Sequence, residues 1–300
     1  MKEKARSIER SAWINNRTYA KWFNQLYSVA ISTFDWQGLP PTVDARFIEH
    51  ILFWNQYAVY FEDVALGQIC LPAMINGKLN IYNIPTMRAA YANNGYFNNT
   101  LNEDNSVILF DNYARVAIAN DIKMYAERLY NIDRTIDINV NAQKTPVLVQ
   151  ADEKEQLTLK NVYMKWEGNM PVIYGYRGQN IDLSVLKTDA PFVADKLFML
   201  KRQTLMEALT FLGVESNTSD KSERLVTDEI QSNFGLTEAM RNNRLKARQQ
   251  AADKINRMFG TDIKVRFNSN LTLSKIMEGR DNNNGSIYNN DSELVPGAGE

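Results

Sequence analysis

The chain has 300 residues, enough to bury a sizeable core and to divide into more than one sub-domain. Its hydrophobic fraction of 44% and charged fraction of 23% are those of an ordinary globular chain and exclude collagen-like and disulfide-framework classes. The 34 Lys and Arg residues face 35 Asp and Glu residues, giving a net charge of −1. This balance argues against a conventional nucleic-acid binder, whose phosphate contacts require a basic excess.

The first long helix is predicted between residues 8 and 34, where apolar side chains recur at helical spacing, and it should stop before Leu39-Pro40-Pro41. A small antiparallel meander is expected over 57–110. Its strands are predicted at 58–61, 79–84 and 107–110, with hairpin turns at Asn76-Gly77 and Asn94-Gly95.

The strongest helical pattern of the chain runs from Ile118 to Val140 and implies packing against other long helices. A compact α+β insertion follows it, with strands predicted at 146–149, 157–160, 171–176 and 181–186 and a short helix at 161–166. The remaining elements are predicted as a helix after Pro191 that closes at Gly213, a polar mobile loop over 215–233, a helix over 237–259 and a strand over 263–267.

The residue types needed for metal or nucleophilic catalysis are scarce. The single cysteine, Cys70, lies in an apolar run and is expected to be buried, and the single histidine, His50, is interpreted as a packed or surface residue of a short helix. These two residues cannot assemble a Cys/His zinc site, and a catalytic triad would depend on His50 alone. The lone thiol suits a reducing compartment, and the charged N-terminus and short apolar runs predict neither a secretory signal nor a membrane span.

Nucleotide and hydrolase motifs are also missing from the sequence: it contains no P-loop, GxGxxG, HExxH or GxSxG pattern. Acidic runs at 152–155 and 223–229 could hold Mg²⁺, which leaves a metal-dependent nuclease as one hypothesis, but such runs are usually solvated surface. We therefore expect a protein that is not an enzyme and that needs no cofactor or metal.

The predicted helix 237–259 carries many basic residues. Glu238 and Asp253 are interleaved with them, and Asp253 is spaced to form an i,i+4 pair with Arg257, so a solvated face is the preferred interpretation. A nucleic-acid-binding module that acts without a ring is the alternative. The basic residues are Arg241, Arg244, Lys246, Arg248, Lys254 and Arg257. Long helices around an α+β insertion, with no catalytic constellation, are typical of a structural or assembly protein.

Several sequence motifs follow one another in a characteristic order along the chain. They are Asn141-Ala142-Gln143-Lys144-Thr145-Pro146-Val147-Leu148, Tyr163, Glu167-Gly168-Asn169, Pro171-Val172-Ile173, Lys187-Thr188-Asp189-Ala190-Pro191, Asp195-Lys196-Leu197, Thr210-Phe211-Leu212-Gly213 and Glu223-Arg224-Leu225-Val226-Thr227-Asp228-Glu229. In these motifs the chain resembles a known family: the head–tail connector, also called portal or upper collar protein, of small short-tailed phages of the Picovirinae type. The similarity is densest between residues 139 and 230, with weaker anchors near 39–42 and 254–267.

The resemblance implies an α+β fold with long stem helices, a small strand-rich clip and a mixed α/β wing, assembled as a twelve-subunit ring at one capsid vertex. Through such a ring the genome is packaged and ejected, and the tail attaches to it. The expected divisions are a wing over 1–111, stem helices over 112–144 and 191–214, a clip over 145–190, a tunnel loop over 215–234, a wing or crown helix and strand over 235–278, and a disordered tail over 279–300.

The resemblance also implies which residues meet the DNA. Two lysines of the family form positive rings in the channel, and they correspond here to Lys187 and Lys196; Lys221 and Arg224 of the loop are further candidates. Twelve copies of a lysine would surround one duplex with weak contacts that permit sliding, so a near-neutral chain suits passage of DNA better than tight binding.

The partners implied are further copies of the chain, double-stranded DNA, the major capsid protein, the tail or lower collar protein and, transiently, a packaging ATPase, with no membrane. The family's packaging RNA is a doubtful partner, because Glu3 and Glu9 dilute the basic charge of the N-terminus. The implied location is the head–tail junction of the virion, after assembly in the host cytoplasm.

Overall fold

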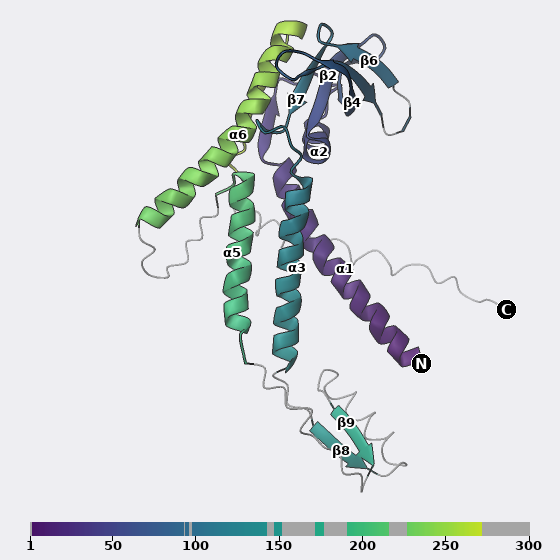
Figure 1. Ribbon diagram of the computed structural model, residues 1–300, viewed down its shortest axis with the longest axis vertical. Coiled ribbons are helices and arrows are strands. Elements are labelled where there is room, and N and C mark those ends of the chain that lie inside the picture. Colours follow the sequence, from purple (N-terminus) through teal and green to yellow (C-terminus); the bar gives the residue numbers. More distant parts are fainter. Residues whose placement is uncertain are drawn as a thin grey trace, which may run out of the picture. The chain divides into compact units, whose positions relative to one another are not determined.

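The computed structural model describes residues 2–92, 94–95, 98–142, 147–151, 172–176, 191–215 and 227–271, with side chains in the first helix from residue 14 onward. It is a mixed α+β chain, as predicted (Figure 1). The chain divides into two compact units. The first joins Met1–Tyr19 to Glu127–Thr204, and the second joins Ala20–Ala126 to Leu205–Glu300.

Helix α1 (Lys2–Ile31) confirms the first predicted helix. Within the second unit it buries Trp22, Leu26 and Val29, which recur at intervals of three and four residues on one helical face. The prediction extended this helix to Phe34, but Phe34 begins strand β1 (Phe34–Gln37), which pairs antiparallel with the distant β10 (Lys264–Phe267). Tertiary pairing therefore decides where α1 stops.

Helix α2 (Ala45–Asn55) contains His50 and begins at an N-cap, Asp44, whose carboxylate accepts a hydrogen bond from the backbone N–H of Arg46 at 2.9 Å. It ends at Gln56, which adopts a left-handed conformation with φ of 62°. The short helix predicted around His50 is thus confirmed, and it leads directly into strand β2.

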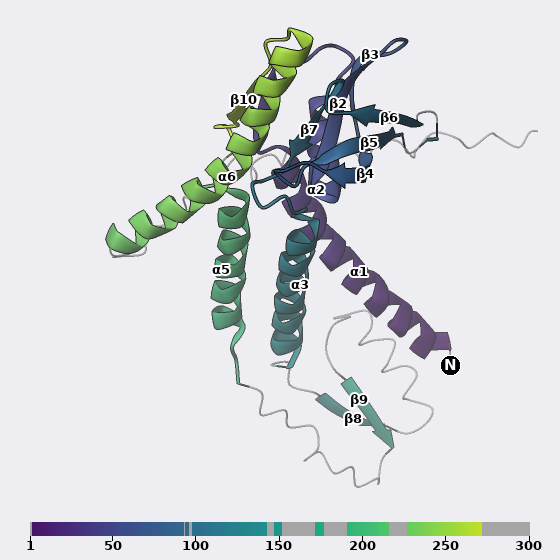
Figure 2. The ribbon, with the colours of Figure 1, turned by 45° about the horizontal axis from the view of Figure 1, so that its top comes forward.

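The predicted meander is two three-stranded antiparallel sheets rather than one. One has the order β3-β2-β7, and the other has the order β4-β5-β6 (Figures 1 and 2). The strands are β2 (Tyr57–Asp63), β3 (Gly67–Leu71), β4 (Ala73–Leu79), β5 (Pro85–Tyr91), β6 (Asn98–Asn102) and β7 (Ser106–Phe110).

The two predicted hairpin turns have different outcomes. Asn94-Gly95 lies between the paired strands β5 and β6, as predicted. Asn76-Gly77 instead lies within β4, at a shift of register against β5, and residues 80–84, predicted as strand, form the turn. Asn80 explains this difference, because its Oδ1 accepts hydrogen bonds from the backbone N–H groups of Tyr82 and Ile84 at 3.0 and 2.9 Å.

Three further helices follow: α3 (Ala119–Ala142), α5 (Ala194–Leu212) and α6 (Thr227–Phe259). The first two confirm the predicted long helices and run antiparallel side by side (Figures 1 and 2). The third corrects the prediction of a loop up to residue 233, because α6 already begins at Thr227. The polar composition of residues 227–233 suggested a loop, but a polar sequence is also compatible with a helix. None of the helices in the described parts of the chain combines the length and apolar character that crossing a membrane requires.

The insertion between α3 and α5 contributes β8 (Val147–Ala151) and β9 (Val172–Tyr176), which pair in parallel. They confirm the strands predicted at 146–149 and 171–176. The predictions for 157–160, 161–166 and 181–186, and for a tail over 279–300, lie outside the described residues.

The main core of the second unit lies where α2 and α6 cover strands β1, β2, β7 and β10. Its centre includes Ile48, Leu52, Tyr60, Leu109 and Ile255, none of which is measurably exposed. A second apolar cluster joins the two three-stranded sheets through residues such as Val59, Phe61 and Ala90. The main core joins segments far apart in the sequence, so it fixes α6 against the N-terminal half of this unit.

Candidate functional site

Four charged side chains lie buried together in the second unit. They are Glu49 of α2, Asp111 after β7, and Arg244 and Arg248 of α6, and each is at most 5% exposed. Arg248 is the centre of this cluster: its guanidinium donates to both carboxylate oxygens of Glu49 at 2.8 and 2.7 Å and to Asp111 Oδ1 at 2.7 Å. The two cations and two anions balance, which is the condition for burying charges in a protein interior.

Neighbouring groups add hydrogen bonds to this ion cluster, and Nε of Arg244 is the cluster atom without a partner among the described residues. Trp36 Nε1 donates to Glu49 Oε1 at 2.9 Å, and the ring of Phe34 lies 4.2 Å from the guanidinium carbon of Arg248. Arg248 also donates to the backbone carbonyl of Asp111 at 2.6 Å. The cluster therefore ties α6 to β1, α2 and the end of β7.

The electrostatics of the cluster favour its charged forms. Burial alone would raise the pKa of Asp111, but the guanidinium groups of Arg244 and Arg248 outweigh that effect and hold it below its ordinary value. Burial would likewise lower the pKa of Arg248, yet Glu49 and Asp111 raise it above its ordinary value. Both groups are thus charged at neutral pH, which is what a buried structural ion cluster requires.

The ion cluster corrects the prediction that α6 presents a solvated basic face. Lys246, Lys254 and Arg257 are exposed as predicted, but Arg244 and Arg248 are buried. No ion pair between Asp253 and Arg257 forms in the described structure, although their spacing predicted one. The sequence signal that could have located the cluster was weak: Glu49 lies between apolar neighbours, and Asp111 directly follows the apolar strand β7.

Arg241 of α6 is also engaged within the protein. It donates to the carbonyl of Gly213, where α5 ends, at 2.8 Å and to the carboxylate of Glu215 at 2.9 Å. Because Arg241, Arg244 and Arg248 all have internal partners, the alternative of a nucleic-acid-binding face on this helix loses three of the cations on which it depended.

Gly213 confirms the predicted end of α5 and adds a requirement of its own. Its φ is 78°, a left-handed conformation that favours glycine, and a Cβ at this position would lie 2.7 Å from the Cα of Arg241. The turn between α5 and the polar segment that follows is therefore held directly against α6.

In the first unit, Asn139 joins the end of α3 to the start of α5. This residue is buried, its amide donates to the carbonyl of Pro191 at 2.9 Å, and its Oδ1 accepts from the N–H of Val193 at 3.0 Å. An ion pair of 3.0 Å between Lys201 and Asp133 adds a second link between the same helices. Both links fix the part of α5 in which the predicted DNA-contacting residue Lys196 lies.

Lys196 lies in the first turn of α5, and its side chain is exposed. Within the described part of the chain it has no hydrogen-bond or ion-pair partner. It is therefore free to meet a phosphate, whereas Lys201 on the same helix already has a carboxylate partner. The other predicted contacts, Lys187, Lys221 and Arg224, lie outside the described residues.

Large apolar side chains are exposed close to Lys196. Phe198, Met199 and Leu200 are consecutive on α5, and their side chains are 57%, 71% and 47% exposed. Ile138 and Val140 near the end of α3 are exposed as well. We call these five residues the apolar stem surface. Large apolar side chains left exposed on neighbouring helices are suited to contact with another protein molecule.

The remaining predicted chemical groups lie within the fold. Cys70 is buried, as predicted, and its burial raises the pKa of the thiol. His50 is half-buried, and its Nδ1 is 2.7 Å from the hydroxyl of Tyr27. In the described parts of the chain, no three His, Cys, Asp or Glu residues gather in a way that could hold a metal ion. Of the acidic runs 152–155 and 223–229, residues 152–155 and 223–226 lie outside the described residues, and Asp228 and Glu229 lie at the start of α6, where the backbone alone is described.

Comparison with known proteins gives the class of protein to which this fold corresponds. The profile of the Phage Connector (GP10) family matches residues 3–272, nearly the whole chain. The chain is also similar to one in the solved portal and tail of native bacteriophage P68, at 18% sequence identity and a TM-score of 0.48, with 93% of this chain and 97% of that chain covered. The protein belongs to the phage connector family.

It is accordingly a head–tail connector, or portal protein, of a short-tailed phage, and its place is the head–tail junction of the virion. Connectors are structural proteins of the virion. The family expected from the sequence motifs is confirmed by a match that covers the helices, the insertion and the described C-terminal elements alike.

Proposed function

We propose that this connector acts as a closed ring of identical subunits through which double-stranded DNA enters and leaves the capsid. Membership of the connector family carries the proposal, and the apolar stem surface supports the ring. In an isolated subunit, Phe198, Met199 and Leu200 leave a large apolar area in water. A neighbouring copy that covers this area would gain roughly 25 cal/mol for each Å² buried.

The resemblance to Picovirinae connectors sets the proposed number of subunits at twelve. The clip of each subunit, residues 145–190, and the tail proteins would meet at the outward end, and the wing would meet the capsid protein. A separate packaging ATPase would dock transiently during assembly in the host cytoplasm, and a packaging RNA remains a doubtful partner. The proposed role is mechanical, without catalysis by this chain and without a cofactor.

Of the four proposed DNA contacts, Lys196 is the one that lies within the described residues. Its exposure and its lack of an internal partner support this role, because an ammonium group already paired with a carboxylate would not bind phosphate as readily. Lys187, Lys221 and Arg224 are proposed contacts from the family motifs alone. A few cations per subunit, repeated around a ring, provide contacts that break easily, which suits DNA in motion.

The experiment replaces both lysines, Lys187→Ala and Lys196→Ala, in the complete phage. Rings should assemble normally, and retention or passage of packaged DNA should change. A matched control replaces Lys246 with alanine, since this lysine is exposed on α6 in the other unit. If packaging, retention and ejection equal those of the control, the assignment of these lysines is overturned. That result would not affect the proposal that the subunits form a ring.

A non-ring nucleic-acid-binding virion or assembly protein remains as the alternative function. It predicts that a single subunit binds duplex DNA through exposed cations of α6. Because Arg244 and Arg248 are buried, the variant that tests it is Lys246→Glu, in place of substitutions that would disrupt the core. The alternative would be favoured if a monomer binds duplex DNA and Lys246→Glu abolishes that binding.

A further inference from the structure

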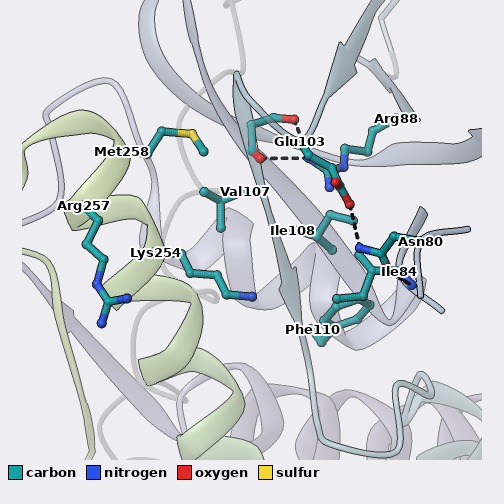
Figure 3. A pocket seen from close by; sticks show the side chains of 11 residues that line it. Asn80, Ile84, Arg88, Glu103, Val107, Ile108, Phe110, Lys254, Arg257 and Met258 are labelled. Carbon is teal, nitrogen blue, oxygen red and sulfur yellow. Dashed lines mark hydrogen bonds between the residues drawn. The ribbon is translucent and has the colours of Figure 1, made fainter. Parts of the chain in front are cut away.

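A pocket of about 440 Å³ lies in the second unit between α6 and the strands that face it (Figure 3). Its walls are apolar, and include Ile84, Val107, Phe110 and Met258. Its polar lining is mainly cationic. Lys254 and Arg257 contribute from α6 and Arg88 from β5, against a single carboxylate, Glu103. The pocket therefore combines a hydrophobic surface with an excess of positive charge.

The two cations of α6 are available to a ligand. Both side chains are exposed, and neither has an ion-pair partner within the described residues. In Figure 3 the ammonium group of Lys254 extends from α6 toward the side chains of Ile84 and Phe110. The carboxylate of Glu103 is held at the other side of the pocket, where it accepts a hydrogen bond from Asn80 Nδ2 at 2.9 Å.

Arg88 supplies the second, independent indication of a ligand. Its side chain is only 3% exposed. One terminal nitrogen donates to the backbone carbonyls of Asn102 and Ser106 at 2.7 and 2.8 Å, and the other donates to the carbonyl of Pro85 at 3.3 Å. Its Nε has no hydrogen-bond partner among the residues that the structure describes. Burial lowers the pKa of this guanidinium, and the nearby Glu103 opposes that shift only in part, so a further anion in the pocket would favour the charged form.

These features together select an acidic peptide with apolar side chains. A nucleic-acid surface is a poorer match, because phosphate backbones are bound along rows of exposed cations, whereas this pocket is lined largely by apolar groups. The chain itself contains such a peptide. Residues 281–300 hold four acidic side chains and neither lysine nor arginine, and they include apolar residues such as Ile287, Tyr288 and Leu294.

We propose that the acidic C-terminal segment, residues 281–300, binds in this cationic pocket. The 29 residues after Leu271 could extend to about 95 Å, so the length of the chain does not prevent binding within one subunit or to the next copy. A tethered segment also binds at a high effective concentration, so weak contacts suffice to keep the pocket occupied. The proposal concerns this unit alone and holds whether or not rings form.

Carbodiimide coupling of the natural, full-length protein tests the contact directly. This reagent joins a carboxylate to a lysine amine only where the two groups touch. Mass spectrometry of the digested product should show Lys254 coupled to Asp291, Glu293 or another acidic residue of 281–300. Lys246, exposed on the same helix but outside the pocket, is the internal control. Equal coupling at both lysines, or coupling of Lys254 to Glu103 alone, would overturn the proposal.

Thiol labelling provides a second readout that follows occupancy of the pocket. A cysteine introduced as Met258→Cys should react about fivefold faster when the four acids of the tail are changed to amides, or when Lys254→Glu and Arg257→Glu remove the two cations proposed to pair with the tail. The buried natural Cys70 stays unreactive. The matched control, Lys246→Glu with Lys264→Glu, changes the net charge equally outside the pocket and should leave the rate unchanged.

Added probes identify the occupant. A synthetic peptide of residues 281–300 should slow the labelling of the amide-tail variant again, whereas duplex DNA should have no effect. Protection by the DNA and not by the peptide would assign the pocket to nucleic acid and overturn the proposal. Identical labelling rates in all variants would also overturn it.

Discussion

Arg248 is the residue on which the second unit depends most directly. Its guanidinium bridges Glu49 and Asp111, which belong to separate parts of the N-terminal half, and all three side chains are at most 2% exposed. Buried ion pairs of this kind add little net stability over an apolar replacement, but losing one partner leaves the other charge buried and unpaired.

Replacing Arg248 with alanine should therefore be severe. We expect the free energy of unfolding to fall by about 3–5 kcal/mol, because Glu49 and Asp111 would keep the cost of burial without their cation. Lys246→Ala on the exposed side of the same helix should change it by less than about 0.5 kcal/mol. Urea unfolding of both variants measures the difference, and equal stabilities would show that the ion cluster is not structural.

The same cluster predicts a dependence of stability on pH. The pKa of Asp111 is lower in the folded protein than its ordinary value of 3.8, so on acidification the unfolded chain binds this proton first. Asp111 therefore contributes fully to the stability of the folded protein at pH values above its ordinary pKa of 3.8. This contribution is lost as the pH falls from there through the lower pKa of the folded state.

Stability measured between pH 6 and pH 3 should consequently fall less steeply for Asp111→Asn than for the natural protein, starting from a lower value. Asp262→Asn, which removes an exposed carboxylate, is the control and should leave the slope nearly unchanged. A slope that Asp111→Asn fails to reduce would contradict the assignment of a charged, buried Asp111.

For single residues, the sequence predicted the burial of apolar side chains but not the burial of charged ones. Periodicity located Ile122 and Leu129, and the apolar run around Cys70 predicted its burial, because burial of apolar groups follows local pattern. Arg244 and Arg248 looked like surface charges, because their partners Glu49 and Asp111 are more than 130 positions away in the sequence. Only the tertiary pairing distinguishes them from Lys246.

At the scale of elements, helices were predicted more accurately than turns and sheet order. The glycines that end α5 and α6 were read correctly from the sequence, and both have positive φ. The arrangement of β2 to β7 in two sheets was not predicted, because strand order depends on long-range pairing such as that of β2 with β7. The turn at 80–84 was missed because it depends on hydrogen bonds to the side chain of Asn80.

Two glycines provide a matched test of how the helices are joined. Gly213→Ala should destabilise the protein by about 1–3 kcal/mol, because its φ of 78° is strained for alanine and the new Cβ would meet the backbone of α6. Gly235→Ala within α6 meets nothing within 4 Å and should stabilise the helix by about 0.5–1 kcal/mol. Thermal unfolding of the two variants should shift in opposite directions, and a neutral Gly213→Ala would refute the close approach.

At the scale of the whole molecule, the first unit contains exposed groups that are not engaged by the rest of the subunit in the described structure. Lys196 has no internal partner in the described structure, and the apolar stem surface is open to water. The near-neutral net charge of −1 fits this account, because a channel that conducts DNA must not hold it tightly. The connector family was identified from motifs, whereas the contact surfaces between subunits leave no comparable signature in one sequence.

The central claim, that this connector works as a ring, is tested most directly by imaging the purified protein end-on together with native mass measurement. The account predicts closed rings of one subunit number with an open central channel, twelve by the family resemblance. A protein that stays monomeric at every concentration, and that is found as a monomer in virions, would contradict it.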